Sequence, residues 1–294
     1  MICKRITYCL VILIALFGCN SNKNSMPEIN ESEYENVVLG DDLIRIGMPD
    51  RLDYLIDKLV LSDEMIGLLA ETDKSLFDEN LLNSPENAKY YNTSRTRAVN
   101  MGVYGAELNY LIHFSQSQFS MKYVVASKQI ADQIGVAMAF DQDAVREYQS
   151  NVESNDSLIT VIFGVYDNAR RMLKNEEQFM LSSLVIVGSW VENMYITTTL
   201  FKRIQSTSLK SKIVTKILEQ KDYLSQVIEA VELLDEGDNV FVTELLQSLN
   251  AINKVYSDFG DRLLSEKDVH DLEIEIEKVR TQIIKVNQIE KFHG

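Results

Sequence analysis

Proline is scarce in this chain, and its absence from most of the sequence restricts the fold. The prolines are Pro27, Pro49 and Pro85, so residues 86–294 contain none. Because proline interrupts helices, a long proline-free stretch rich in Leu, Ile, Val, Glu, Lys and Gln favours helix. No segment alternates polar and apolar residues well enough to predict a strand. We therefore predict an all-α fold, a multi-helix bundle of about 8–10 helices.

Cysteine is equally scarce, and all three cysteines lie near the start: Cys3, Cys9 and Cys19. Residues 20–294 therefore cannot form a disulfide, a catalytic thiol or a cysteine–metal site. Basic residues are also few, with 29 Lys and Arg against 44 Asp and Glu. The formal net charge of −15 disfavours nucleic acid and anionic lipid surfaces as partners. We expect no nucleic-acid partner.

The first 18 residues have the form of a secretion signal. Lys4 and Arg5 give a positive start, and the apolar run over residues 6–18 is 13 residues long. A helix needs about 20 apolar residues to cross a bilayer, so this run has the length of a signal-peptide core. It ends in Leu-Phe-Gly-Cys, which resembles the bacterial lipobox, where a small residue precedes a cysteine that is acylated.

The lipobox predicts a signal peptide over residues 1–18 and acyl chains such as palmitate on Cys19. The alternative is an uncleaved N-terminal anchor, and either one tethers the chain to a membrane. The residue after the cysteine is Asn20 and not Asp, which favours the outer membrane in lipoprotein sorting. The first acidic residue is Glu28, so the periplasmic face is favoured over the cell surface.

The remaining chain divides into a tether and a helical domain. Residues 19–40 start with the lipidated cysteine and a polar, acidic stretch without apolar periodicity, which predicts a flexible tether. Residues 41–294 form the predicted helical domain, either undivided or as sub-bundles 49–205 and 206–294. Start and stop signals predict helices over 49–59, 63–70, 94–114, 117–134, 141–152, 155–174, 175–204, 209–236 and 239–257, with Ser84 as a cap before Pro85.

The last helix has the clearest pattern. Ser265 and Asp268 are spaced as a capping box. Apolar residues then follow at alternating spacings of three and four, namely Val269, Leu272, Ile276, Val279, Ile283 and Val286. Such a seam predicts packing against other helices of the same chain, or a dimer contact as the alternative.

Two segments resemble each other, residues 100–114 and 186–201. When their acids are aligned, Glu107 and Tyr110 match Glu192 and Tyr195, and Gly102 with Tyr104 matches Gly188 with Trp190. Glycines inside helices are costly, which predicts a kink or a close helix–helix approach there. The spacing places each Glu and the Tyr three residues later on one helical face.

These segments allow two interpretations. One is a ligand pocket between the two helices, lined by Tyr104, Glu107, Tyr110, Trp190, Glu192 and Tyr195. The other is a structural network, because a buried glutamate needs a partner. Its candidate partners are Arg95, Arg97, Arg170 and Arg171.

The same two segments, together with residues 130–140, carry a family resemblance. The segments GVYGAELNY (102–110), IADQIGVAMAF (130–140) and VGSWVENMYI (187–196) resemble uncharacterised lipoproteins of the Bacteroidetes. The resemblance covers residues 81–196 and departs from the family pattern at Glu107 and Ser189. It implies an all-helical lipoprotein and supplies no mechanism.

The sequence offers little for catalysis or cofactors. The histidines are His113, His270 and His293, and none begins a helical metal-binding motif, so we expect no metal and no cofactor. The leading hypothesis is a non-enzymatic, lipid-anchored envelope protein that binds a protein or glycan partner. The alternative is a small-ligand receptor or transport-accessory lipoprotein that uses the Glu/aromatic pocket. An enzyme using Glu107 and Glu192 as acid and base comes third.

Overall fold

The computed structural model describes Gly47, Leu55 and residues 64–71, 73–135, 176–235, 237–260 and 262–286. Within these residues every regular element is a helix and none is a strand, so the predicted all-α fold is confirmed. All of them belong to the compact unit Leu43–Gly294, while Met1–Asp42 form a separate unit. The predicted leader, the tether and the helices over 141–152 and 155–174 lie outside the described residues, as does most of the helix over 49–59.

The main helices follow the predicted boundaries within a few residues. They are α4 (Ser94–His113), α5 (Ser117–Gln133), α8 (Glu176–Phe201), α9 (Thr207–Glu232), α10 (Val240–Phe259) and α11 (Glu266–Ile284). A short helix over 64–71 comes before them. Three 3-10 helices lie between it and α4, namely η2 (Lys74–Leu76), η3 (Glu79–Leu81) and η4 (Pro85–Tyr90).

The helix ends show why these boundaries could be read from the sequence. Thr93 and Ser265 each form a capping box, and the Asn239 side chain accepts a hydrogen bond from the backbone N–H of Val242 at 3.2 Å. Gly135 and Gly237, just beyond α5 and α9, have φ of +77° and +74°, a conformation that favours glycine. Side-chain caps and glycines are local signals, so they need no tertiary context.

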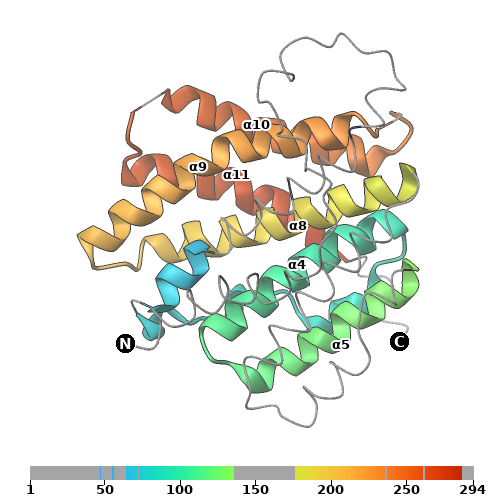
Figure 1. Cartoon of the computed structure of the whole chain (residues 1–294), viewed down its shortest axis with the longest axis horizontal. Coiled ribbons are helices and arrows are strands. Elements are labelled where there is room, and N and C mark those ends of the chain that lie inside the picture. Colours follow the sequence, from blue (N-terminus) through green and yellow to red (C-terminus); the bar gives the residue numbers. More distant parts are fainter. Residues whose placement is uncertain are drawn as a thin grey trace, which may run out of the picture. The chain divides into compact units, whose positions relative to one another are not determined.

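The helices pack side by side around α8, which lies between α4 and the group of α9, α10 and α11 (Figure 1). Short turns connect α4 to α5, α9 to α10 and α10 to α11, and each of these pairs is in contact. Helix α8 contacts α4, α9 and α11. The seam residues within α11, from Val269 to Ile283, are buried in the core together with residues of α8 and α10, which agrees with packing inside the chain. The last predicted seam residue, Val286, lies beyond α11 and is only partly buried.

Helix α8 is the most apolar of the described helices. Its segment Phe179–Phe201 has the length and hydropathy of a membrane span, yet 78% of the relevant window is buried inside the protein. A helix that is apolar on all sides and enclosed by other helices has the properties of a core helix. Helix α8 lies within the helix that the sequence predicts over 175–204.

Two glycines bring the backbones of α4 and α8 together. A Cβ atom on Gly102 would lie 2.0 Å from the carbonyl oxygen of Val185, and one on Gly188 would lie 1.8 Å from that of Val99. The close approach predicted from these mid-helix glycines is therefore present. Gly102 lies beside Ser189, and Glu107 and Glu192 further along both reach Arg280, so α4 and α8 run parallel and the two similar segments lie side by side.

Replacing either glycine with alanine should force the two backbones apart. Gly102→Ala or Gly188→Ala should lower the free energy of unfolding by about 3 kcal/mol or more, at the upper end of the cost of overpacking a core. Denaturant unfolding measures this change. Gly67→Ala is the control, because its new Cβ would meet only the flexible His113 ring, at 3.2 Å. Equal effects at Gly188 and Gly67 would contradict the close contact.

Candidate functional site

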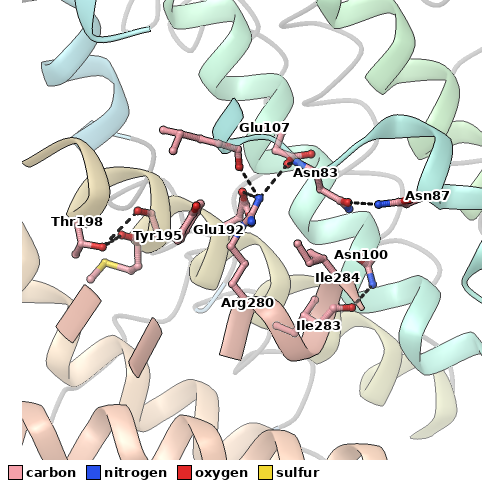
Figure 2. A network of polar contacts seen from close by, with 12 residues as sticks. Asn83, Asn87, Asn100, Glu107, Glu192, Tyr195, Thr198, Arg280, Ile283 and Ile284 are labelled. Carbon is pink, nitrogen blue, oxygen red and sulfur yellow. Dashed lines mark hydrogen bonds and ion pairs between the residues drawn. The ribbon is translucent and has the colours of Figure 1, made fainter. Parts of the chain in front are cut away.

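Three charged side chains from three helices meet in the interior: Glu107 of α4, Glu192 of α8 and Arg280 of α11 (Figure 2). We call them the carboxyl–arginine cluster. Both glutamates are 0% exposed and Arg280 is 8% exposed. Charges that are buried this completely are stable only when they are paired and hydrogen-bonded.

The guanidinium group of Arg280 donates from Nε and Nη2 to two partners. Its Nε and Nη2 donate to the two carboxylate oxygens of Glu192 at 2.8 and 3.0 Å, which is a bidentate pair. Nη2 also donates to the carbonyl oxygen of Leu81 at 2.5 Å. The same nitrogen lies 3.8 Å from Oε1 of Glu107, so Glu107 forms the weaker ion pair.

Glu107 is held mainly by the segment between η3 and η4. Its Oε1 accepts a hydrogen bond from the backbone N–H of Asn83. The Asn83 side chain donates to the Tyr91 hydroxyl at 3.0 Å and accepts from Asn87 at 2.8 Å. The second oxygen of Glu107, Oε2, accepts no hydrogen bond from a nitrogen or hydroxyl group of the described residues. One carboxylate of the cluster therefore has fewer donors than the other.

The aromatic ring of Tyr195 covers the outer side of the guanidinium group. The centre of the ring lies 4.0 Å from Cζ of Arg280, within the range of a cation–π contact. Tyr195 is only partly buried, so it separates Arg280 from solvent. This contact stabilises the arginine without supplying a negative charge.

The last turn of α11 is held by two further hydrogen bonds, one from α4 and one from Tyr91, which follows η4. Asn100 donates to the carbonyl oxygen of Ile283 at 2.9 Å, and the Tyr91 hydroxyl donates to that of Ile284 at 3.4 Å. These carbonyls lie at a helix end, where no partner is available within the helix. The cluster and these bonds together fix the position of the C-terminal end of α11 relative to α4.

Burial has the largest influence on the pKa values of Glu107 and Glu192. It raises the pKa of Glu107 well above its ordinary value, and the neighbouring Glu192 raises it further, while Arg280 opposes both. Burial also raises the pKa of Glu192, against Arg280 and its hydrogen bonds. Burial alone would lower the pKa of Arg280, but Glu192 and then Glu107 raise it overall.

The other residues of the predicted pocket have separate partners. The hydroxyl of Tyr104 donates to the carbonyl of Ser84 at 2.8 Å, and the Tyr110 hydroxyl accepts from the backbone N–H of Asp78 at 2.8 Å. Trp190 donates to Gln220 of α9 at 3.1 Å. The structure therefore brings Glu107, Glu192 and Tyr195 together around Arg280, and directs Tyr104, Tyr110 and Trp190 elsewhere. The ligand-pocket hypothesis stays a prediction.

The arginine that pairs with the acids was missed by the sequence reasoning. Arg97 instead donates to the Tyr91 carbonyl at 2.8 Å, Arg95 forms no described ion pair with either acid, and residues 170 and 171 lie outside the described part. Arg280 directly follows the seam residue Val279. An arginine flanking an apolar seam was the only signal, and it is also typical of a solvated position.

The histidines lie apart from the cluster. His113 is at the end of α4, where its ring approaches Gly67 and burial lowers its pKa. His270 is 3.1 Å from Glu273 on the surface of α11. Within the described ranges no three His, Cys, Asp or Glu side chains are grouped to hold a metal ion, and His293 lies outside them.

The structure thus defines an all-α bundle with a buried carboxyl–arginine cluster at the junction of α4, α8 and α11. Comparison of the chain with protein-family models, with curated proteins and with solved structures finds no match.

Removing Arg280 should be strongly destabilising. Arg280→Ala leaves two buried carboxyl groups without their cation and the Leu81 carbonyl without its donor. We expect the free energy of unfolding to fall by about 3–5 kcal/mol, and the thermal midpoint by on the order of 10 °C. Differential scanning calorimetry measures the shift.

The matched control is Arg203→Ala. Arg203 pairs with Asp78 at 2.7 Å, but its side chain is 43% exposed. Exposed ion pairs contribute about 0–1 kcal/mol, so this midpoint should barely change. A similar small change for Arg280→Ala would show that the buried pairing contributes little.

Proposed function

We propose that this chain is a lipid-anchored, all-helical protein of the bacterial outer membrane that works by binding a protein or glycan partner in the envelope. The lipobox at residues 16–19, directly after a charged start and a short apolar run, is the observation that carries the anchor. Two or more acyl chains give a stable membrane attachment. The periplasmic face is the favoured location.

The complete burial of Glu107 and Glu192 supports a binding function over a catalytic one. A general acid or base must come within hydrogen-bonding distance of its substrate. Glu107 and Glu192 are both 0% exposed, and their contacts with Arg280 and Asn83 hold helices together. This supports a structural role for the pair, and we propose that the partner binds on the outer surface of the domain.

The anchor is tested by replacing its cysteine. Cys19→Ala should abolish labelling of the protein by an alkyne analogue of palmitate and leave the leader attached, because the thiol is the acylation site. Labelling followed by mass spectrometry of the N-terminus measures both. Cys9→Ala is the control, since this cysteine lies within the leader and should not affect labelling. An unmodified, uncleaved N-terminus in the wild type would refute the anchor.

The structural role of the acids is tested by melting curves at pH 5. This pH lies near the ordinary glutamate pKa of 4.5, so differences in protonation between native and unfolded states contribute little. Glu107→Ala and Glu192→Ala should each cost about 1–3 kcal/mol, because their buried hydrogen-bond partners lose an acceptor. Glu244→Ala, at an exposed position of α10, is the control.

An unchanged or raised midpoint for both alanine variants would favour the small-ligand receptor instead. Residues that are kept for ligand binding commonly reduce stability, so their removal is neutral or stabilising.

A further inference from the structure

The carboxyl–arginine cluster contains two acids and one base. Among the described residues, Arg280 is the cation that ion-pairs with Glu107 or Glu192. If both acids were ionised, the enclosed cluster would carry one uncompensated negative charge. Such a charge is costly to bury, and proteins usually avoid it by neutralising the group.

The titratable groups around the cluster do not supply a second positive charge. Those that interact electrostatically with it are Tyr91, Tyr104, Tyr123 and Tyr195, and Glu273 and Glu277 act in turn on Tyr195. The tyrosines are neutral phenols whose pKa values are all raised. Glu273 already pairs with Lys202 at 3.0 Å. The charge must therefore be balanced within the cluster.

The geometry decides which acid takes the proton. Both oxygens of Glu192 accept from Arg280, as an ionised carboxylate does. Glu107 has only the Asn83 N–H at Oε1, and no nitrogen or hydroxyl donor at Oε2. The two carboxyl groups are also within hydrogen-bonding reach of each other, and such a bond requires a proton on one of them.

We propose that the folded protein holds one proton on Glu107, donated in a hydrogen bond to Glu192, and that the docking of α11 through Arg280 depends on this proton. The raised pKa of Glu107 agrees with this assignment. When the proton is lost, Glu107 and Glu192 repel each other beside a single guanidinium group, and the attachment of α11 weakens.

The sign of the pH effect follows from the proton count. An unfolded glutamate releases its proton near pH 4.5, whereas Glu107 in the folded chain retains it above that pH. Folding therefore takes up one proton in this range, and stability is highest at low pH and falls as the pH rises towards the native pKa. The folding equilibrium constant loses about tenfold for each pH unit from this one group.

The effect should be local to the end of α11. The cluster ties Arg280 to α4 and α8, and the neighbouring bonds tie Ile283 and Ile284 to Asn100 and Tyr91. The contact between α9 and α10 contains none of these residues. It includes the bond from the Tyr256 hydroxyl to the Ile217 carbonyl at 2.9 Å.

The first test compares wild type with Glu107→Gln in the full-length chain by denaturant unfolding from pH 5 to pH 8. Glutamine keeps an acceptor for Asn83 and a permanent donor for Glu192, and takes up no proton. The folding equilibrium constant of the variant relative to wild type should rise by about tenfold per pH unit. Glu244→Gln makes the same charge change at an exposed site and should show no such trend. A pH-independent ratio for Glu107→Gln would overturn the proposal.

The second test needs only the wild-type chain, so it holds even if a variant does not fold. Infrared spectroscopy at pH 7 should show the stretching band of a buried, protonated carboxyl group that resists exchange with solvent. Hydrogen exchange of residues 276–284, corrected for the intrinsic rate, should lose protection as the pH rises from 5 to 8. Absence of the band, or protection of residues 276–284 that does not change with pH, would refute the shared proton as the control of α11 docking.

Discussion

The contact between the backbones of α4 and α8 is the constraint on which the rest of the interior depends. Gly102 and Gly188 each leave no room for a Cβ atom, so the two helices approach more closely than helices with side chains at the contact can. One helical turn further on, this spacing brings Glu107 and Glu192 close enough to face the same arginine. A wider separation would leave each acid in need of its own partner. Two residues without side chains thereby determine how the charges are arranged.

The carboxyl–arginine cluster then specifies how the C-terminal helix is placed. The apolar seam of α11 repeats along its length, so a shift by one turn would bury a similar set of residues. Arg280 removes this ambiguity, because its Nε and Nη2 groups meet two oxygens of Glu192 and the Leu81 carbonyl in one register only. A buried ion pair of this kind adds little net stability, since desolvation offsets the attraction. Its contribution is to select one packing among several.

The fold could be predicted from the sequence because its signals are local. Capping residues such as Asn239 and Ser265 satisfy the first N–H groups of their own helices, and Gly237 turns the chain just beyond α9. The similarity of residues 100–114 and 186–201 also predicted a close approach, because a buried mid-helix glycine has few other causes. The 3-10 geometry of η4 was not predicted, since Ser84 precedes Pro85 as a helix start would, yet makes no side-chain cap.

The amino-acid sequence by itself determined the helices, their ends, the apolar seam of α11 and the need of both glutamates for a partner. These properties depend on residues within one or two helical turns of each other. Only the tertiary structure decided that the partner is Arg280 and that Asn83 supplies the second contact. Glu192 and Arg280 are 88 residues apart in the chain, and no local preference for helix, turn or cap connects positions so distant. Their pairing exists because α4, α8 and α11 pack together, and the low polarity of that junction then raises the pKa of Glu107.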